Sequence, residues 1–306
     1  VGLINTSFGG TPAEAWTSRQ KLESHPELKK ILDAFEQAIA QYPMALGRFQ
    51  DELKKWQEEK QKAEAEGKQA SPAPRGPVDP SANPQRPSGL FNAMINPLIP
   101  FGIRGVIWYQ GESNAENAAQ YATLFPAMIE DWRARWGQGE FPFLFVQLAP
   151  FKKIVNEPME SAWAELREAQ RLTTLHPRRK KEVGDRLALA ARKLAYGEDI
   201  PAIGPTFKEL KVEGNKAILS FDNLGGGLVA KDGPLTGFTI AGADHKFHPA
   251  TAEIVGDTVV VTSPHVAAPI AVRYGWSDFP VINLWNKAGL PASPFRTDDF
   301  PWITAR

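Results

Sequence analysis

Three short stretches of the sequence carry the groups that acyl transfer requires. The pair Gly9-Gly10 follows an apolar run, Gln110 and Glu112 follow a second one, and His176 precedes a proline at the start of a helical pattern. Ester hydrolysis needs a nucleophile, a general base and N–H groups that stabilise an oxyanion. The glycine turn can supply backbone N–H groups, Gln110 can supply side-chain N–H groups, and His176 is the candidate base. This pattern predicts ester hydrolysis.

Each of these residues also has a structural interpretation. A glycine pair before a helix is common in ordinary turns, and a glutamine after a strand often only satisfies hydrogen bonds. His176 taken alone is also typical of a helix cap. Glu112 is interpreted either as a buried carboxylate that holds its loop or as a catalytic acid. Residue types alone leave these alternatives open.

The sequence offers two serines as nucleophile candidates by position, Ser7 and Ser113, although neither stands in a Gly-x-Ser-x-Gly sequence. There is no cysteine, which excludes a thiol nucleophile, disulfides and cysteine-ligated metals. Of the five histidines only His245 and His248 are close neighbours, and we interpret them as residues of a solvated turn.

Apolar runs alternate with helical patterns along the first two thirds of the sequence. Residues 1–6, 104–111 and 141–151 are predicted to be buried strands, separated and followed by helices. Because ligands bind at the carboxyl ends of parallel strands, the glycine pair and the glutamine loop are expected at one sheet edge. The pattern predicts an α/β domain whose parallel sheet has helices on both faces.

Two local details accompany this alternation. Thr11 and Glu14 form a capping box with Pro12 at the first helical position, which predicts a helix beginning there. Farther along, the helical patterns of 161–172 and 176–197 follow each other almost directly. Such a short connection cannot hold a strand with its two turns, so one strand expected of the sheet is absent from the sequence.

Composition changes divide the chain into regions. Residues 1–204 are predicted to form the α/β domain, with a charged helical excursion at 24–70 and a proline-rich connector at 71–88. A partner-binding coiled coil is the alternative for the excursion. Residues 205–275 show short alternating runs typical of a β-sandwich-like antiparallel unit, and residues 276–306 are predicted to pack back on the α/β domain.

The overall charge argues against two classes of partner. Lys and Arg total 35 and Asp and Glu total 35, so the sequence lacks the basic surplus of a nucleic-acid binder or a polybasic membrane anchor. No apolar run approaches the roughly 20 residues that span a bilayer. The sequence begins at Val1 without a signal-peptide pattern, from which we expect a processed chain or a fragment.

Several stretches together resemble one family. GLINTSFGGTPAEAW, IRGVIWYQGESNA and HPRRKKEVGDRLALAARKLAYGED are similar to blocks of the sialate O-acetylesterase family of SGNH-type carbohydrate esterases. The resemblance covers nearly the whole chain. It implies a flavodoxin-like, doubly wound parallel sheet with a C-terminal antiparallel β unit. It also implies hydrolysis of acetyl esters on sialic acid or related glycans through a serine acyl-enzyme, without metal or cofactor, and favours a periplasmic or secreted location.

The resemblance also assigns roles to the residues identified above. Gly9 and Gly10 correspond to glycines that help form the oxyanion hole, and Gln110 corresponds to the amide that lines it. Glu112 corresponds to a carboxylate that holds the loop. His176 corresponds to the catalytic base of an Asp-x-His-Pro signature.

The sequence departs from the family at two positions of the triad. The family's nucleophile lies in a Gly-Gln-Ser-Asn block that occurs nowhere in this sequence, and Thr174 stands where the signature has its aspartate. Either the biological chain is longer, or this is a fragment or degenerate homologue without a triad. In the second case a non-catalytic carbohydrate-binding protein is expected, in which Trp108, Tyr109 and Trp276 could stack on sugars. An acetylxylan esterase is a further alternative.

Overall fold

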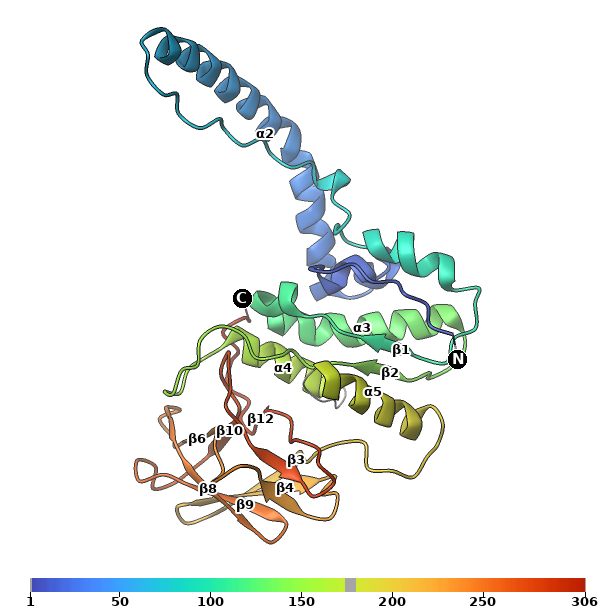
Figure 1. The fold of residues 1–306 in the computed structure, drawn as a ribbon, viewed down its shortest axis with the longest axis vertical. Coiled ribbons are helices and arrows are strands. Elements are labelled where there is room, and N and C mark those ends of the chain that lie inside the picture. The colour runs from blue at the N-terminus through green and yellow to red at the C-terminus, as the bar shows by residue number, and fades with distance from the viewer. Residues whose placement is uncertain (1, 174–179, 306) are drawn as a thin grey trace. The chain divides into compact units, whose positions relative to one another are not determined.

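The chain folds as a mixed α/β protein in which one pair of parallel strands precedes several antiparallel sheets (Figure 1). The computed structural model describes residues 2–173 and 180–305. The chain divides into two units, one comprising Val1–Thr6 with Glu14–Leu98 and the other comprising Ser7–Ala13 with Ile99–Arg306.

The first unit is built around a long helix. After the 3-10 turn η1 (Ala13–Trp16), α1 (Arg19–Glu23) begins at the N-cap Ser18. The helix α2 (Pro26–Ala65) has His25 as its N-cap, whose Nδ1 accepts a hydrogen bond from the Glu27 N–H at 3.2 Å. The short turns η2 (Pro80–Ala82), η3 (Phe91–Ile95) and η4 (Asn96–Leu98) follow. The helix predicted within 24–70 is therefore confirmed.

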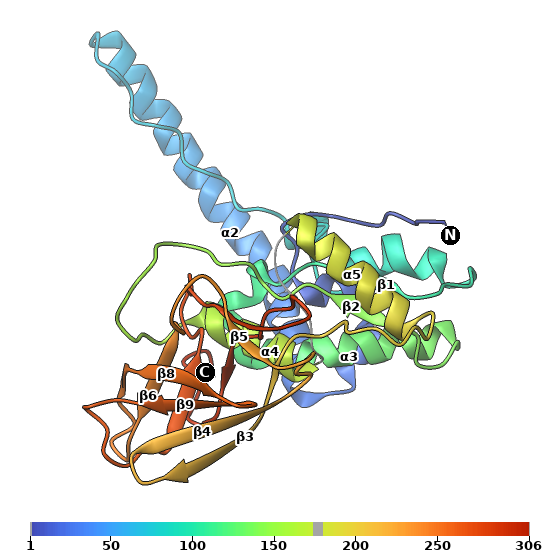
Figure 2. The same cartoon turned by 60° about the horizontal axis from the view of Figure 1, so that its bottom comes forward.

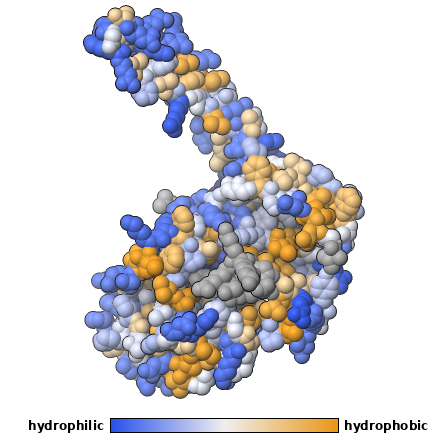
Figure 3. All heavy atoms as spheres, in the orientation of Figure 1, coloured by the Kyte–Doolittle hydropathy of each residue, from blue (hydrophilic) through white to orange (hydrophobic). Residues whose placement is uncertain are grey.

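The proline-rich connector covers one face of α2. In Figure 1 the connector runs alongside α2. The indole N–H of Trp56 donates to the Ser71 carbonyl at 2.8 Å, and Gly76 lies against the Phe49 ring. The half-buried side chains of this face recur at heptad spacing: Tyr42, Leu46, Phe49, Leu53, Trp56, Lys60 and Ala63. The outer surface formed by α2 and the connector is mainly hydrophilic in the view of Figure 3. Trp56 and Phe49 of this face thus contact the chain's own connector, in the region where a coiled coil was the alternative.

Two predictions for the N-terminal residues are wrong. Residues 2–6 form no strand, and Leu3 is 88% exposed, because the described residues offer this segment no neighbouring strand to pair with. Thr11 does not cap an α-helix. Its hydroxyl donates to the Phe8 carbonyl at 2.8 Å, and the Asn114 side chain accepts the Ala13 N–H at 2.9 Å, so only the four-residue turn η1 forms here.

The parallel pair of the second unit lies between two helices. The strand β1 (Val106–Trp108) pairs with β2 (Phe143–Phe145), with Trp108 opposite Phe145. Rings from both strands contact Phe125 and Trp132 of α3 (Ala118–Trp136), as expected for an aromatic core. Leu144 and Val146 pack against α5 (Lys180–Leu194). Helices therefore cover both faces, as predicted.

This sheet has only two strands within the described part of the chain. Ile107 of β1 is 62% exposed, although its neighbour Leu144 on β2 is buried beneath α5. Within the described residues β1 and β2 therefore each have one unpaired edge.

The antiparallel region forms two four-stranded sheets, with strand orders β3-β4-β9-β8 and β12-β10-β6-β7, and a pair β5-β11 (Figure 2). Their inward side chains share one core that includes Leu219, Val261, Ile240, Val272 and Phe295. The strands are β3 (Thr206–Glu213), β4 (Lys216–Asp222), β5 (Leu228–Ala230), β6 (Phe238–Ala241), β7 (Phe247–Pro249), β8 (Thr251–Val255), β9 (Thr258–Thr262), β10 (Ala271–Tyr274), β11 (Leu284–Asn286) and β12 (Phe295–Arg296).

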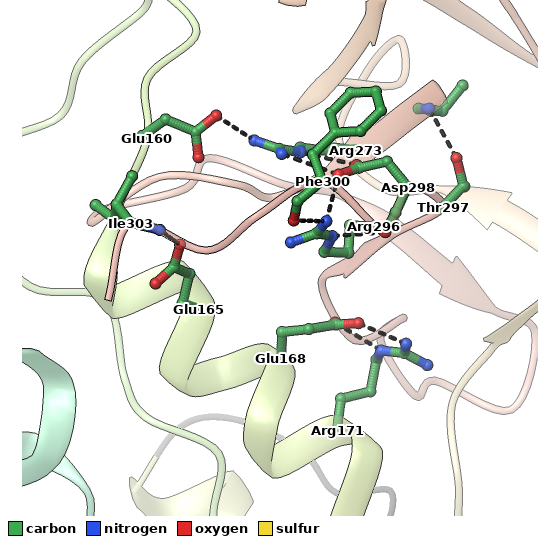
Figure 4. Close-up of polar contacts among 11 residues, drawn as sticks. Glu160, Glu165, Glu168, Arg171, Arg273, Arg296, Thr297, Asp298, Phe300 and Ile303 are labelled. Carbon is green, nitrogen blue, oxygen red and sulfur yellow. Dashed lines mark hydrogen bonds and ion pairs between the residues drawn. The ribbon is translucent and has the colours of Figure 1, made fainter. Parts of the chain in front are cut away.

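A buried carboxylate ties the C-terminal tail to the helices. Glu165 of α4 (Ala162–Thr173) accepts a hydrogen bond from the Ile303 N–H at 2.6 Å (Figure 4). It also accepts the Thr304 N–H at 3.1 Å. The Thr304 hydroxyl in turn accepts the Ala119 N–H at the start of α3, at 3.0 Å. These bonds place the tail against both helices that flank the candidate site.

Candidate functional site

A buried polar network joins the glycine turn to the loop after β1. The Gln110 side-chain amide donates to the Thr11 carbonyl at 3.1 Å and to Asn114 Oδ1 at 2.6 Å, and its oxygen accepts the Tyr121 hydroxyl at 3.1 Å. A primary amide has two N–H donors, so both are engaged within the protein. The geometry thus supports a structural role for Gln110, and its role in an oxyanion hole remains a prediction.

Asn114 is the residue that the sequence interpretation missed. It is buried, and its Oδ1 accepts both the Ala13 N–H and the Gln110 amide, at 2.9 Å and 2.6 Å. One side chain therefore fixes residues 11–13 beside residues 110–114. A buried asparagine needs such partners. The signal was available in the motif YQGESN, where Asn114 stands shortly before the helical run that begins at Ala118.

The helix α4 packs against the loop that follows β1. Gln170 is buried, donates to the Gln110 carbonyl at 3.1 Å and accepts the Leu148 N–H at 2.9 Å. Gly111 has φ +148°, a conformation that side chains rarely adopt, and a Cβ there would lie 2.7 Å from Leu166 Cδ2. Only glycine therefore allows α4 to approach the loop this closely.

We expect Gly111→Ala to destabilise the second unit by about 3 kcal/mol, through backbone strain and overpacking. The matched control is Gly137→Ala at the C-terminus of α3, where φ is +61° but no atom lies within 4 Å of the added Cβ. That variant should lose only about 1 kcal/mol. Urea unfolding checks the difference, and equal losses would show that α4 does not crowd Gly111.

The glycine turn itself is open to solvent. Gly9 and Gly10 are exposed, and Gly10 has φ +70°. Apart from the chain neighbours, no heavy atom of the described residues lies within 4 Å of a Cβ built on either glycine. The Ser113 hydroxyl donates to the Gly10 carbonyl at 3.1 Å. The structure thus brings Gly9, Gly10, Gln110 and Ser113 together, while leaving space beside the turn for a substrate.

Glu112 does not hold this loop as a buried carboxylate, so that expectation is wrong. The side chain is exposed, and it forms no hydrogen bond or ion pair within the described residues. Gln110 and Asn114 make the bonds that hold the loop, which leaves the carboxylate in solvent. Burial, and then the negative charge of Glu112, raise the pKa of Tyr109 above its ordinary value, so this phenol is neutral at physiological pH.

The aromatic and histidine candidates occupy different environments. Trp108, the last residue of β1, is buried against α3. Trp276 is buried, and the Arg273 guanidinium lies 4.6 Å from the centroid of the Trp276 ring. Tyr109, in contrast, is 43% exposed. His245 is exposed on the turn between β6 and β7 and stacks on Phe300. Tyr109 is therefore the aromatic side chain of this set that a sugar could reach.

The predicted base lies outside the described residues, as does Thr174. The described chain ends at Thr173 of α4 and resumes at Lys180 of α5. His176 thus belongs to the connection that follows the helix supporting Gln110 and Gly111. Its assignment as a base stays a prediction.

The described residues contain neither a cluster of metal-binding side chains nor a membrane-spanning helix. Within residues 2–173 and 180–305, no three His, Cys, Asp or Glu side chains lie together as a metal site would require. In the same part of the chain, no helix has both the length and the apolar character needed to cross a membrane.

Comparison with known proteins shows which proteins this chain resembles. Residues 85–191 match the family described as "Carbohydrate esterase, sialic acid-specific acetylesterase". The crystal structure of a carbohydrate acetylesterase from Xanthomonas citri superposes with a TM-score of 0.64 and 48% identity, covering 70% of this chain and 54% of that one. The matched segment and the similar crystal structure are thus both described as carbohydrate esterases.

The chain is also similar to curated proteins that are named sialate O-acetylesterases. Sialate O-acetylesterases of Rattus norvegicus and Homo sapiens are each 30% identical to the chain; both alignments cover 96% of it, and they cover 60% and 57% of those proteins. The chain is thus similar to sialate O-acetylesterases over most of its own length. It spans about 60% of the rat relative, whose alignment of 351 positions exceeds the 306 residues here, so that relative carries residues without a counterpart.

Proposed function

We propose that the protein hydrolyses acetyl esters on sialic acid or a related glycan. Similarity to sialate O-acetylesterases and to a carbohydrate acetylesterase supports the reaction class. The structural observation that carries the proposal is the network of Gln110 and Asn114, which holds the exposed Gly9-Gly10 turn beside the loop after β1. Backbone N–H groups of such a turn are suited to stabilise an oxyanion.

The finer architecture belongs to the same proposal. We infer that β1 and β2 are part of a flavodoxin-like, doubly wound SGNH-hydrolase sheet, in residues 1–204. Residues 205–275 then form a β-sandwich-like unit, and residues 276–306 return to the α/β domain. The carboxyl ends of β1 and β2 lead to Gln110 and to Leu148, the two positions that Gln170 bridges. Sites of open α/β sheets lie at this edge.

The reaction would proceed through a serine acyl-enzyme. His176 accepts the proton of the serine hydroxyl as the oxygen attacks the acetyl carbonyl, and returns it to the departing sugar hydroxyl. Water then releases acetate by the same steps. Gly9 and Gly10 stabilise the oxyanion in both halves of the reaction. Ser7 and Ser113 are the positional candidates for the nucleophile within this sequence.

Covalent labelling tests the serine mechanism. We expect a fluorophosphonate ester to modify one serine of the full-length protein, O-acetylated sialic acid to protect that serine, and His176→Ala to abolish labelling. Peptide mass spectrometry identifies the residue and decides between Ser7, Ser113 and any other serine. Labelling of no serine in folded protein would contradict the mechanism.

A carbohydrate-binding protein without turnover is the competing function. Tyr109 is exposed at the start of the loop after β1, so it could contact a sugar both in an esterase and in a binding protein. Titration with O-acetylated sialic acid separates the two functions, because a binding protein saturates without releasing acetate. Faster release from acetylxylan than from the sialic acid would identify the acetylxylan alternative.

A further inference from the structure

A groove of about 270 Å³ lies within the first unit, between α2 and the C-terminal part of the proline-rich connector with the turn that follows it. Leu32 and Phe35 of α2 form its apolar wall. Its opposite wall carries hydrogen-bonding groups from Ser81, Arg86, Ser88 and Asn92. No residue of the proposed acetyl-transfer site lines it. A concave site with one apolar wall and a few convergent polar groups is typical of small-ligand binding.

Ser88 is the unusual residue of this groove. Its side chain is 3% exposed, and its hydroxyl has no hydrogen-bond partner within the described residues. Its φ is +61°, a left-handed conformation that serine rarely adopts. The backbone is fixed there, because the Ser88 N–H donates to the Glu14 carbonyl at 2.9 Å and its carbonyl accepts the Asn92 N–H at 3.0 Å. Backbone strain and an unsatisfied hydroxyl together are features of functional sites.

Two arginines flank the groove, and they differ in their partners. Arg19 is held by Glu23 at 2.7 Å and by Glu36 at 2.5 Å, so its charge is already neutralised. The side chain of Arg86 is exposed, and it donates only to the Asn83 carbonyl, at 3.1 Å, with no carboxylate partner in the described part of the chain. A guanidinium with free donors binds carboxylates in two-point geometry.

We propose that this groove binds a sugar acid, a monosaccharide that carries a carboxylate. The carboxylate pairs with Arg86, a ring hydroxyl satisfies Ser88, and the apolar face of the ring covers Phe35. Asn92 and Ser81 offer further hydrogen bonds to hydroxyl groups. The site goes beyond the proposed hydrolysis because it needs neither a nucleophile nor a base. It would retain a sugar acid near the enzyme whether or not the ester is cleaved.

Saturation-transfer NMR and calorimetric titration with N-acetylneuraminate test the site. We expect saturable binding that weakens about tenfold for Arg86→Gln and also for the uncharged methyl ester of the same sugar. The matched control is Arg75→Gln on the connector, an exposed arginine outside the groove, which should bind as wild type does. A change in hydrolysis is not part of the readout, so failure of the esterase proposal leaves this test intact.

Ser88→Gly separates a binding role from a structural one. Glycine relieves the strain at φ +61° and removes the hydroxyl, so we expect a melting temperature about 2 °C higher together with about fivefold weaker binding. A merely structural serine would give a lower melting temperature with unchanged binding. Absence of saturable binding, equal affinity for the methyl ester, or an equal loss in Arg75→Gln would each overturn the proposal.

Discussion

Replacing His176 by alanine in the full-length protein should lower acetyl-ester hydrolysis by about 10⁴-fold or more. Without the imidazole, the serine proton has no acceptor at neutral pH, and the residual rate comes from oxyanion stabilisation and binding alone. We expect thermal unfolding to change little, because the proposed role of His176 is chemical. Initial rates on an aryl acetate and a melting curve measure the two effects on the same preparation.

A matched histidine variant makes this result interpretable. His25 caps α2 through its Nδ1, and asparagine keeps an acceptor at that position, so His25→Asn should retain full activity. Activity of His176→Ala near that of the wild type would remove His176 from the mechanism. A large loss of melting temperature would instead assign it to structure.

Replacing Asp298 by alanine should destabilise the second unit by about 3–5 kcal/mol, because it leaves two buried guanidinium groups without their shared carboxylate. Asp298 pairs with Arg273 through two bonds of 2.9 and 3.0 Å and with Arg296 at 2.6 Å, and all three side chains are buried (Figure 4). Only Glu160, half-exposed, would remain beside Arg273, at 2.7 Å.

The pKa directions agree with this dependence. Burial opposes ionisation of Arg273, but the hydrogen bonds and charges of Asp298 and Glu160 raise its pKa above the ordinary value. Burial, with the charge of Arg273, lowers the pKa of Arg296. Both arginines therefore depend on Asp298 to remain charged at low cost.

Urea unfolding of Asp298→Ala measures the loss. The control is Glu213→Ala, which breaks the exposed pair with Lys211 at 2.7 Å and should cost less than about 1 kcal/mol. Similar unfolding midpoints for the two variants would contradict the burial of the Asp298 cluster.

Periodicity predicted the elements whose burial repeats regularly. The helix α3 was predictable because its apolar residues keep helical spacing and Gly137 ends it in a left-handed conformation. The antiparallel region was predictable from its short alternating runs and turns. The strand that we predict to be missing between α4 and α5 falls on residues outside the described part of the chain, so it stays a prediction.

Long-range hydrogen bonds decided what local patterns could not. Thr11 has the residue type of a helix cap. However, the Asn114 side chain, which is distant in sequence, accepts the Ala13 N–H, and the Thr11 hydroxyl donates to the Phe8 carbonyl. The same network satisfies Gln110 and leaves Glu112 in solvent. Which polar group holds a loop depends on segments that folding brings together. The spacing of residues in the sequence therefore cannot predict it.

The most direct measurement of the central claim is acetate release from O-acetylated N-acetylneuraminic acid by the full-length protein. Proton NMR follows the ester, the free sugar and acetate in one sample. We expect acetate and free N-acetylneuraminic acid to appear in equal amounts, at a rate that His176→Ala abolishes. An unchanged ester in the presence of folded protein would contradict the assignment as a sialate-type acetylesterase.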